Sequence, residues 1–172
     1  MVLRQMFFLG LASVILSLLV NLVSPHKIPL VGQYYEFEVV NGVIVPPAAT
    51  EGDPPFIAVD RAQAEFALGE ALFVDAREPE EFDCGTIPGA VNLPFEEMPA
   101  DDLAAYVDST LGGIPKDRTV ITFCSGEECD LSLHLGRNLQ ALGYTNVLIF
   151  FGGAREWDDM GFEMQRRVQC DG

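Results

Sequence analysis

From Ile57 onward the chain alternates short apolar strands with amphipathic helices, and this alternation restricts the fold more than any other feature. Short runs of β-branched and aromatic residues predict strands at Leu72–Asp75, Thr119–Phe123 and Val147–Phe151. Between the last two strands, leucines recur on one helical face and Gly143 follows them as a helix stop. The pattern predicts an α/β fold with a mainly parallel sheet and helices on both of its faces.

An apolar run from Met6 to Val23 precedes this region. It holds about 18 residues, which is near the lower limit for crossing a bilayer. A cleaved signal peptide is the alternative, but Pro25 directly follows the one small residue at a possible cleavage site, Ser24, and no A-x-A-like sequence is present. We therefore expect an uncleaved transmembrane anchor over residues 1–24, with residues 6–23 inside the membrane.

The few charges that flank the apolar run predict its direction in the membrane. Arg4 and the amino terminus lie on one side, and Lys27 is the nearest basic residue on the other. Basic residues are retained on the cytoplasmic side of a membrane. We therefore expect a single-pass protein with its N-terminus in the cytoplasm and the rest of the chain on the outer, periplasmic side.

Residues 25–56 predict a connector, since they carry six prolines and three glycines. Within them, Tyr34 to Val45 alternates weakly, and Asn41-Gly42 suits a two-residue hairpin turn. A short hairpin and an extended spacer both fit this pattern. After the connector we predict one domain over residues 57–166 and a C-terminal tail over residues 167–172.

Composition excludes several functions. The net charge of −16 leaves no basic stripe to neutralise phosphates, so nucleic acid is not an expected partner. The chain has four cysteines in 172 residues, too few to suggest a disulfide scaffold. They are Cys84, Cys124, Cys129 and Cys170. No cysteine pair has zinc-ligand spacing with a matching second pair, so we expect no metal site and no cofactor.

The segment from Cys124 to Cys129 carries the candidate chemistry. Cys124 directly follows a predicted strand, and ligands gather at the carboxyl ends of strands in a parallel sheet. The loop leads into a helix N-terminus, where N–H groups and the helix dipole stabilise a thiolate, and Gly126 lets the loop curl. We therefore predict that Cys124 is reactive and is surrounded by the loop backbone of Ser125, Gly126, Glu127 and Glu128.

Four further segments surround this loop in a characteristic order. They are Asp75-Ala-Arg77-Glu78-Pro79-Glu80-Glu81-Phe82, Ile87-Pro88-Gly89-Ala90-Val91-Asn92, Gly143-Tyr144-Thr-Asn146-Val147 and Gly152-Gly153-Ala-Arg-Glu156-Trp157. With Cys124 between them, over residues 57–164, the set resembles the rhodanese-like domain family. The resemblance implies a five-stranded parallel sheet and a catalytic cysteine that carries sulfur as a persulfide. Membrane-anchored bacterial members of the family have a similar N-terminal helix.

The active loop departs from the family pattern. Family loops usually carry arginine directly after the cysteine and often five residues further on, and these places hold Ser125 and Cys129 here. Glu127 and Glu128 add negative charge, and a carboxylate about 6 Å from a thiolate costs roughly 0.7 kcal/mol even in water. We therefore expect weak activity with thiosulfate, a dianion that no arginine holds. The missing arginine also excludes the cysteine phosphatases of similar fold.

Cys129 places a second thiol across the same loop. Its attack on a persulfide at Cys124 would release the sulfur and leave an internal disulfide. A small buried apolar side chain at the start of the helix is the alternative role. The resemblance further implies an ion pair between Asp75 and Arg77, which either supplies a cation to the site or holds a turn.

For the other candidate side chains the sequence favours structural or surface roles over catalytic ones. His134 lies one helical turn after Asp130, and we expect a solvated surface residue rather than a general base. Cys84 is expected to be structural, and Cys170 to lie in a terminus where disorder concentrates. Trp157 is expected to pack the last helix into the core.

The leading hypothesis is a single-domain, membrane-anchored, rhodanese-like sulfurtransferase. Cys124 carries the sulfane sulfur and Cys129 is the possible resolving thiol. Its partners are a sulfur donor and a thiol acceptor, each a small molecule or a protein. Two alternatives stand beside it. One is a catalytically silent rhodanese-homology module that binds a partner at the membrane through its acidic surface, and the other is a thiol–disulfide exchanger without sulfur transfer.

Overall fold

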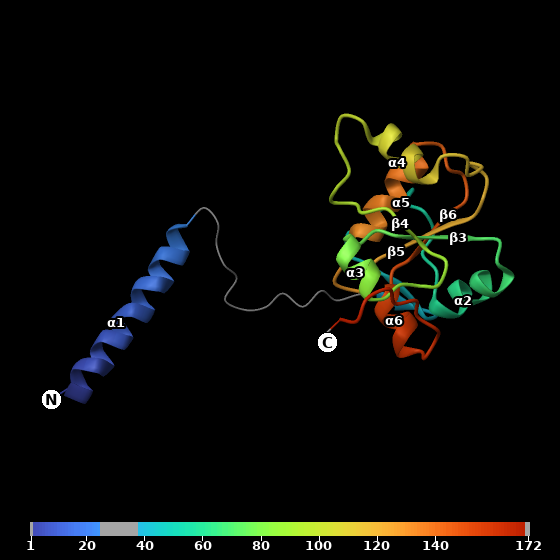
Figure 1. The fold of residues 1–172 in the computed structure, drawn as a ribbon. Coiled ribbons are helices and arrows are strands. Elements are labelled where there is room, and N and C mark those ends of the chain that lie inside the picture. Colours follow the sequence, from blue (N-terminus) through green and yellow to red (C-terminus); the bar gives the residue numbers. More distant parts are fainter. Residues whose placement is uncertain (1, 25–37, 171–172) are drawn as a thin grey trace. The chain divides into compact units, whose positions relative to one another are not determined.

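The computed structural model describes residues 2–24 and 38–170, which belong to two separate units (Figure 1). The first contains helix α1, Val2–Val23. Its segment Arg4–Asn21 has a mean hydropathy of 1.5 and is long and apolar enough to cross a membrane. A signal sequence near an N-terminus meets the same criteria. The predicted apolar helix is therefore confirmed by length and composition, while the first part of the predicted connector lies outside the described residues.

The second unit is built on a parallel sheet with the strand order β4-β3-β5-β6. The strands are β3 (Leu72–Asp75), β4 (Val91–Asn92), β5 (Val120–Phe123) and β6 (Val147–Phe150). Phe56 adds one parallel bridge to Ile149 at the outer edge of β6. This bridge takes the place of the fifth strand that the resemblance implied. Pro54 and Pro55 precede it and have no N–H groups with which to lengthen the ladder.

Helices cover both faces of this sheet, as predicted. They are α2 (Val59–Leu68), α3 (Pro79–Cys84), α4 (Leu103–Leu111), α5 (Leu131–Ala141) and α6 (Gly153–Asp159). Side chains alternate across each strand, so that Val74 and Val120 pack with α4 and α5, whereas Phe73 and Ile121 pack with α2, α3 and α6. Trp157 of α6 is buried in the second of these clusters, as expected.

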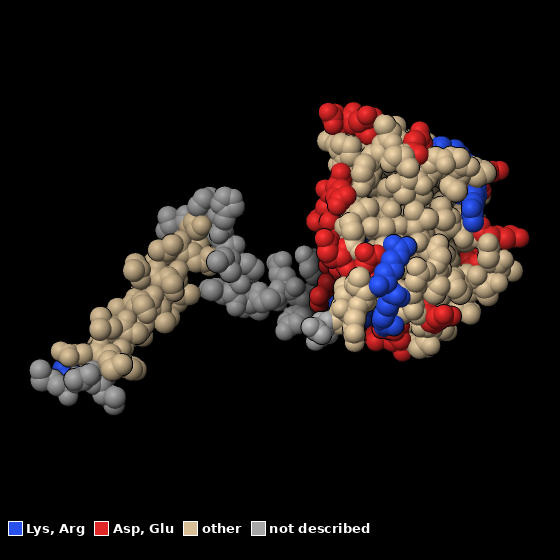
Figure 2. Space-filling view, in the orientation of Figure 1, with Lys and Arg blue, Asp and Glu red and all other residues tan. Residues whose placement is uncertain are grey.

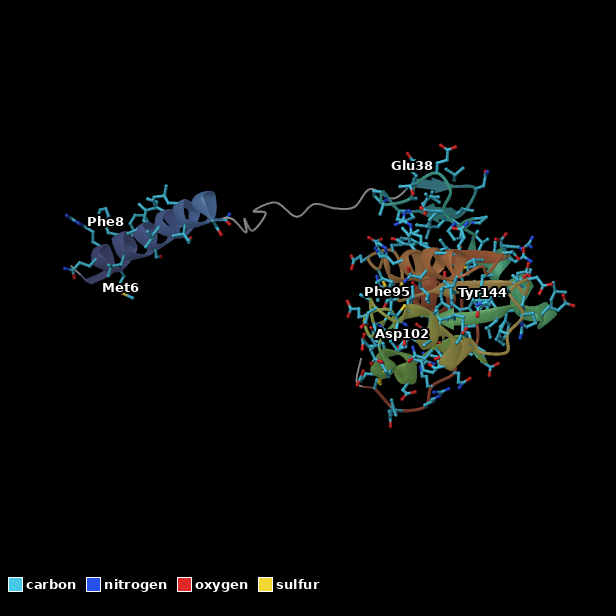
Figure 3. The ribbon with its side chains drawn as sticks, turned by 90° about the horizontal axis from the view of Figure 1, so that it is seen from above. Met6, Phe8, Glu38, Phe95, Asp102 and Tyr144 are labelled. Atoms are coloured by element: carbon cyan, nitrogen blue, oxygen red, sulfur yellow. A yellow bond between two sulfur atoms is a disulfide. The ribbon has the colours of Figure 1, made fainter. Side chains whose placement is uncertain are left out.

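A hairpin precedes the sheet, so the hairpin interpretation of the connector is confirmed for residues 38–45. Strands β1 (Glu38–Val40) and β2 (Val43–Val45) pair antiparallel. Asn41 and Gly42 both have positive φ, 53° and 79°, which a tight hairpin turn of this length requires. Figure 3 shows the hairpin, marked by Glu38, at the rim of the domain and away from Phe95 and Asp102.

The segment after the hairpin is tied to α5 by an ion pair. The Arg137 guanidinium donates two hydrogen bonds of 2.7 Å to the carboxylate of Asp53. This pairing lowers the pKa of Asp53 to about 2. The contact holds this proline-rich segment against α5.

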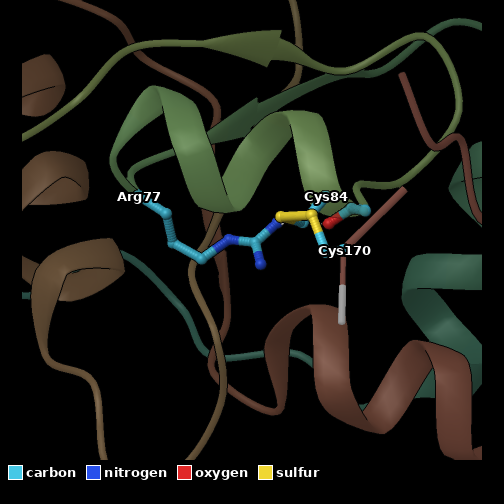
Figure 4. Close-up of a disulfide and its surroundings, with 4 residues drawn as sticks. Arg77, Cys84 and Cys170 are labelled. Atoms are coloured by element: carbon cyan, nitrogen blue, oxygen red, sulfur yellow. Dashed lines mark hydrogen bonds between the residues drawn. A yellow bond between two sulfur atoms is a disulfide. The ribbon is translucent and has the colours of Figure 1, made fainter. Parts of the chain in front are cut away.

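The C-terminal segment is also fixed, by a disulfide between Cys84 and Cys170 whose Cα atoms lie 5.5 Å apart (Figure 4). The expectation of a disordered end is therefore wrong for Cys170, while Cys84 does have a structural role. An antiparallel bridge between Thr86 and Gln165 brings the two cysteines together. The pairing spans 86 residues of sequence and no local pattern marks it, which is why the sequence did not predict it.

Candidate active site

The predicted active loop lies at the carboxyl end of β5, between that strand and α5. Helix α6 holds it from one side, because the N–H of Ala154 donates to the carbonyl oxygen of Cys124 at 2.8 Å. Gly153 has φ +63°, and a Cβ at this position would meet the Cys124 carbonyl oxygen and lie 2.8 Å from the Gly126 nitrogen. A glycine is therefore required where α6 closes against the loop.

Cys124 is completely buried at the base of the loop. Its thiol donates to the carbonyl oxygen of Cys129 at 2.8 Å and lies 3.6 Å from the hydroxyl oxygen of Ser132. Burial raises the pKa of this thiol well above its usual value, and the interaction with Cys129 raises it further. Cys124 is therefore protonated at neutral pH in this conformation.

Cys129 is half-buried and is the more acidic thiol. Its pKa is lowered to about 7, chiefly by the interaction with the neighbouring Cys124 thiol. The backbone N–H groups of Ser125 and Leu131 also favour its thiolate, against the opposing effect of burial. The sequence predicted the thiolate at Cys124, whereas the structure gives the lower pKa to Cys129. The reason is that Cys124 is more deeply buried, whereas the Cys129 thiolate is stabilised first by the Cys124 thiol and then by the two backbone N–H groups.

Of the remaining loop residues, Ser125 and Gly126 contact neighbouring helices, whereas Glu127 and Glu128 are exposed to solvent. Ser125, where the family usually has arginine, donates its hydroxyl hydrogen to the carboxylate of Glu81 on α3 at 2.9 Å. Glu127 and Glu128 are exposed, so their charges are screened by solvent. Gly126 is buried against α6. The loop is thus fixed to α3 and α6, and its two glutamates lie on the outside.

Asp75 and Arg77 form the predicted ion pair at the end of β3. The guanidinium donates two hydrogen bonds to the carboxylate, at 2.9 and 2.6 Å, and a third to the carbonyl oxygen of Gly85 at 2.7 Å. The Thr86 hydroxyl donates to the same carboxylate at 2.8 Å. Both charged side chains are buried, so the pair holds the turn before α3.

A pocket of about 440 Å³ opens beside the loop. Arg77, the disulfide-bonded Cys84 and Ser125 line it, and Figure 4 shows Arg77 next to the disulfide. The other lining residues are Glu80, Glu81, Gly85, Ala154, Arg155, Asp158, Asp159, Met164 and Arg166. The pocket therefore meets the active loop at Ser125, and neither Cys124 nor Cys129 lines it.

Some site residues were not predicted. Glu81 and Arg155 belong to the segments 75–82 and 152–157 that resemble the family, but the sequence of these segments does not indicate that both residues line one pocket. Ser132 follows the loop in α5 and lies against Cys124.

His134 stacks on Phe95, with ring centroids 5.5 Å apart, and is not a pocket residue. In the described part of the chain, no group of three or more His, Cys, Asp or Glu residues is arranged to hold a metal ion.

Comparison with known proteins agrees with this architecture. The family model of the rhodanese-like domain matches residues 58–160, which is more than half of the chain. The chain belongs to the rhodanese-like domain family. One relative, the human thiosulfate:glutathione sulfurtransferase, is 32% identical over 109 residues, which cover 60% of this chain and 92% of the relative. A sulfurtransferase of Allochromatium vinosum is 35% identical over 89 residues, or 51% of this chain and 72% of the relative.

Solved structures show the same rhodanese-like fold. A human single-domain sulfurtransferase superposes with a TM-score of 0.51 and 28% identity, over 63% of this chain and 97% of the other. The BH2092 protein of Bacillus halodurans gives a TM-score of 0.55 at 21% identity, over 65% and 78% of the two chains. Similarity to named sulfurtransferases supports a sulfurtransferase at the level of the family.

Proposed function

We propose that this protein transfers sulfane sulfur from a donor to a thiol acceptor, with Cys124 as the carrier and Cys129 as its partner thiol. The observation that carries the proposal is the hydrogen-bonded pair of free cysteines at the carboxyl end of β5. One thiol is buried and the other is ionised near neutral pH, so the pair can move a proton between its two sulfurs.

The first step loads the carrier. The Cys129 thiolate accepts the proton of Cys124, and the resulting Cys124 thiolate attacks the outer sulfur of a donor persulfide, R–S–SH. The S–S bond of the donor breaks, RS⁻ leaves, and Cys124–S–SH remains. Cys124 is completely buried and does not line the pocket, so this step requires the loop to open, and Ser125 is the loop residue that borders the pocket.

The second step unloads the carrier by one of two routes. An acceptor thiolate attacks the outer sulfur, which yields the acceptor persulfide and restores the Cys124 thiolate. Alternatively, Cys129 attacks the inner sulfur of Cys124–S–SH, hydrogen sulfide leaves, and a Cys124–Cys129 disulfide remains. Two equivalents of a thiol reductant then return both cysteines to the free form.

Single-turnover transfer to an external thiol tests these roles in the full chain. Cys124→Ser is expected to abolish transfer. Cys129→Ser is expected to slow loading, because the proton acceptor is lost, but to leave a persulfide that is not resolved internally. If Cys124→Ser still transferred sulfur at the wild-type rate, the proposal would be wrong. Rapid cycling of a Cys124–Cys129 disulfide without retained sulfur would instead support a thiol–disulfide exchanger.

We also propose that thiosulfate is a poor donor. The loop offers no arginine, and Ser125, which replaces it, is bonded to a carboxylate of α3. A dianion entering this pocket meets Glu80, Glu81 and Asp159 at its walls. Figure 2 shows many acidic and few basic side chains on the face of the domain in view, which also disfavours a dianion. A turnover rate with thiosulfate equal to that of rhodaneses with arginine in the loop would contradict this expectation.

For its location, we propose a single-pass protein anchored by residues 6–23, with its N-terminus in the cytoplasm and its domain on the outer side. The Cys84–Cys170 disulfide supports this arrangement, because disulfides persist in oxidising compartments. Protease added to spheroplasts, in which the outer membrane has been opened and the inner membrane is intact, is expected to digest the domain. Protection of the domain until the membrane is opened would contradict the orientation.

A further inference from the structure

The arginines of the pocket differ in what they already bind. Arg77 is paired with the buried Asp75, and Arg166 lies 3.1 Å from the carboxylate of Asp158. Arg155 is exposed at the pocket, and among the described residues no carboxylate lies within ion-pair distance of its guanidinium. It is therefore the pocket arginine that remains available for a ligand.

Arg155 also lies directly against the active loop. Its backbone N–H donates to the carbonyl oxygen of Ser125 at 3.0 Å. A Cβ placed on Gly126 would be 3.5 Å from the Cβ of Arg155. The cation is thus presented from α6 beside Ser125, the position at which the loop itself has no arginine.

The walls around this arginine are acidic. Glu80, Glu81 and Asp159 line the same pocket and are exposed. Glu81 accepts a hydrogen bond from Ser125, while Glu80 and Asp159 form no ion pair with any residue that the structure describes. One available cation among several carboxylates complements a ligand that carries both a carboxylate and an ammonium group. It does not complement a dianion.

We propose that Arg155 is the specificity-determining residue that binds the carboxylate of a small amino-acid-type persulfide or thiol, with Glu80 and Asp159 facing its ammonium group. The proposal rests on the proposed function, because it names the class of substrate at the same loop. It adds a binding residue outside the active loop, because Arg155 belongs to α6. A volume of about 440 Å³ accommodates a ligand of this size.

The test compares three donors that differ only in their charged groups. They are the persulfides of cysteine, of cysteamine, which lacks the carboxylate, and of 3-mercaptopropionate, which lacks the ammonium group. With the full chain in detergent, Arg155→Met is expected to raise KM about tenfold for the two donors with a carboxylate, as one charge-assisted hydrogen bond implies. KM for cysteamine persulfide stays unchanged. Arg155→Lys keeps part of the affinity, and Arg61→Met, on the exposed surface of α2, changes none of these values.

A binding measurement separates this proposal from the proposed function. S-methylcysteine cannot donate sulfane sulfur, so its affinity for the Cys124→Ser variant reports on the pocket alone. Weaker binding of S-methylcysteine after Arg155→Met supports the inference whether or not transfer occurs. An equal change for cysteine and cysteamine persulfides, or no change in S-methylcysteine binding, overturns it.

Discussion

The thiol of Cys124 donates a hydrogen bond to the carbonyl oxygen of Cys129 at 2.8 Å and also faces the Cys129 sulfur. The four residues between the two cysteines are curled so that the two thiols interact without a covalent bond. The buried Cys124 keeps its proton because its pKa is raised. The partly exposed Cys129 loses its proton more readily because its pKa is lowered, so Cys129 is both the more acidic and the more accessible thiol.

This division predicts which cysteine an alkylating reagent modifies first. Only the thiolate reacts, and a pKa lowered to about 7 means that the Cys129 thiolate is present at a lower pH than an ordinary thiolate. Alkylation of Cys129 by iodoacetamide is therefore expected to rise with pH and to reach half of its maximal rate near pH 7. Peptide mapping at several pH values measures both the site and the midpoint.

Cys124→Ala provides the control for this alkylation. Loss of the donated hydrogen bond removes the largest cause of the lowered pKa, so the midpoint for Cys129 is expected to move upward toward the usual value of 9.0. An unchanged midpoint, or modification of Cys124 before Cys129 in the wild type, would show that the pair is not arranged in this way.

The buried ion pair predicts a large loss of stability on removal of one charge. Asp75→Ala leaves the Arg77 guanidinium without its partner in the protein interior, which typically costs about 3–5 kcal/mol of unfolding free energy. Arg61→Ala removes an exposed pair on α2 and is expected to cost no more than about 0.5 kcal/mol. Urea unfolding of both variants measures the difference, and equal losses would contradict the structural role of the Asp75–Arg77 pair.

The disulfide predicts that reduction destabilises the domain. A cross-link that closes a long loop typically contributes about 2–4 kcal/mol. The unfolding midpoint in urea is therefore expected to fall when Cys84 and Cys170 are both changed to serine. The double variant should also become insensitive to added reductant. A wild-type midpoint that does not respond to reductant would argue against the Cys84–Cys170 bond.

Gly153 and Gly161 form a matched pair for testing the contact between α6 and the loop. Both have positive φ, +63° and +76°, but a Cβ on Gly161 meets open space whereas one on Gly153 meets the active loop. Alanine at either position costs about 1 kcal/mol or more for the backbone conformation. Only Gly153→Ala is expected also to change the rate of Cys129 alkylation, because it displaces the loop. Equal alkylation rates in the two variants would contradict this contact.

Local sequence patterns were sufficient for much of the fold. The predicted strand at Leu72–Asp75 has the bounds of β3, and the predictions for β5 and β6 differ from the structure by one residue each. These strands are short, mostly apolar runs with helices on both sides, so their positions follow from the local sequence pattern. The position of Cys124 at the end of β5 was predicted for the same reason.

The sequence did not predict features that depend on contacts between distant segments. The bond between Ser125 and Glu81 joins residues 44 positions apart, and the disulfide joins residues 86 positions apart. The position of Arg155 at the active loop depends on how α6 packs. The order of acidity of Cys124 and Cys129 depends on which sulfur is more deeply buried and on how the two thiols contact each other, and residue types do not encode this geometry.

Mass mapping of the full chain after treatment with a persulfide donor tests the central claim most directly. Wild-type protein is expected to gain one sulfur atom on the peptide that carries Cys124, and Cys129→Ser is expected to retain that sulfur for longer because internal resolution is lost. No added sulfur on Cys124, or added sulfur only on Cys129, would contradict the assignment of Cys124 as the carrier.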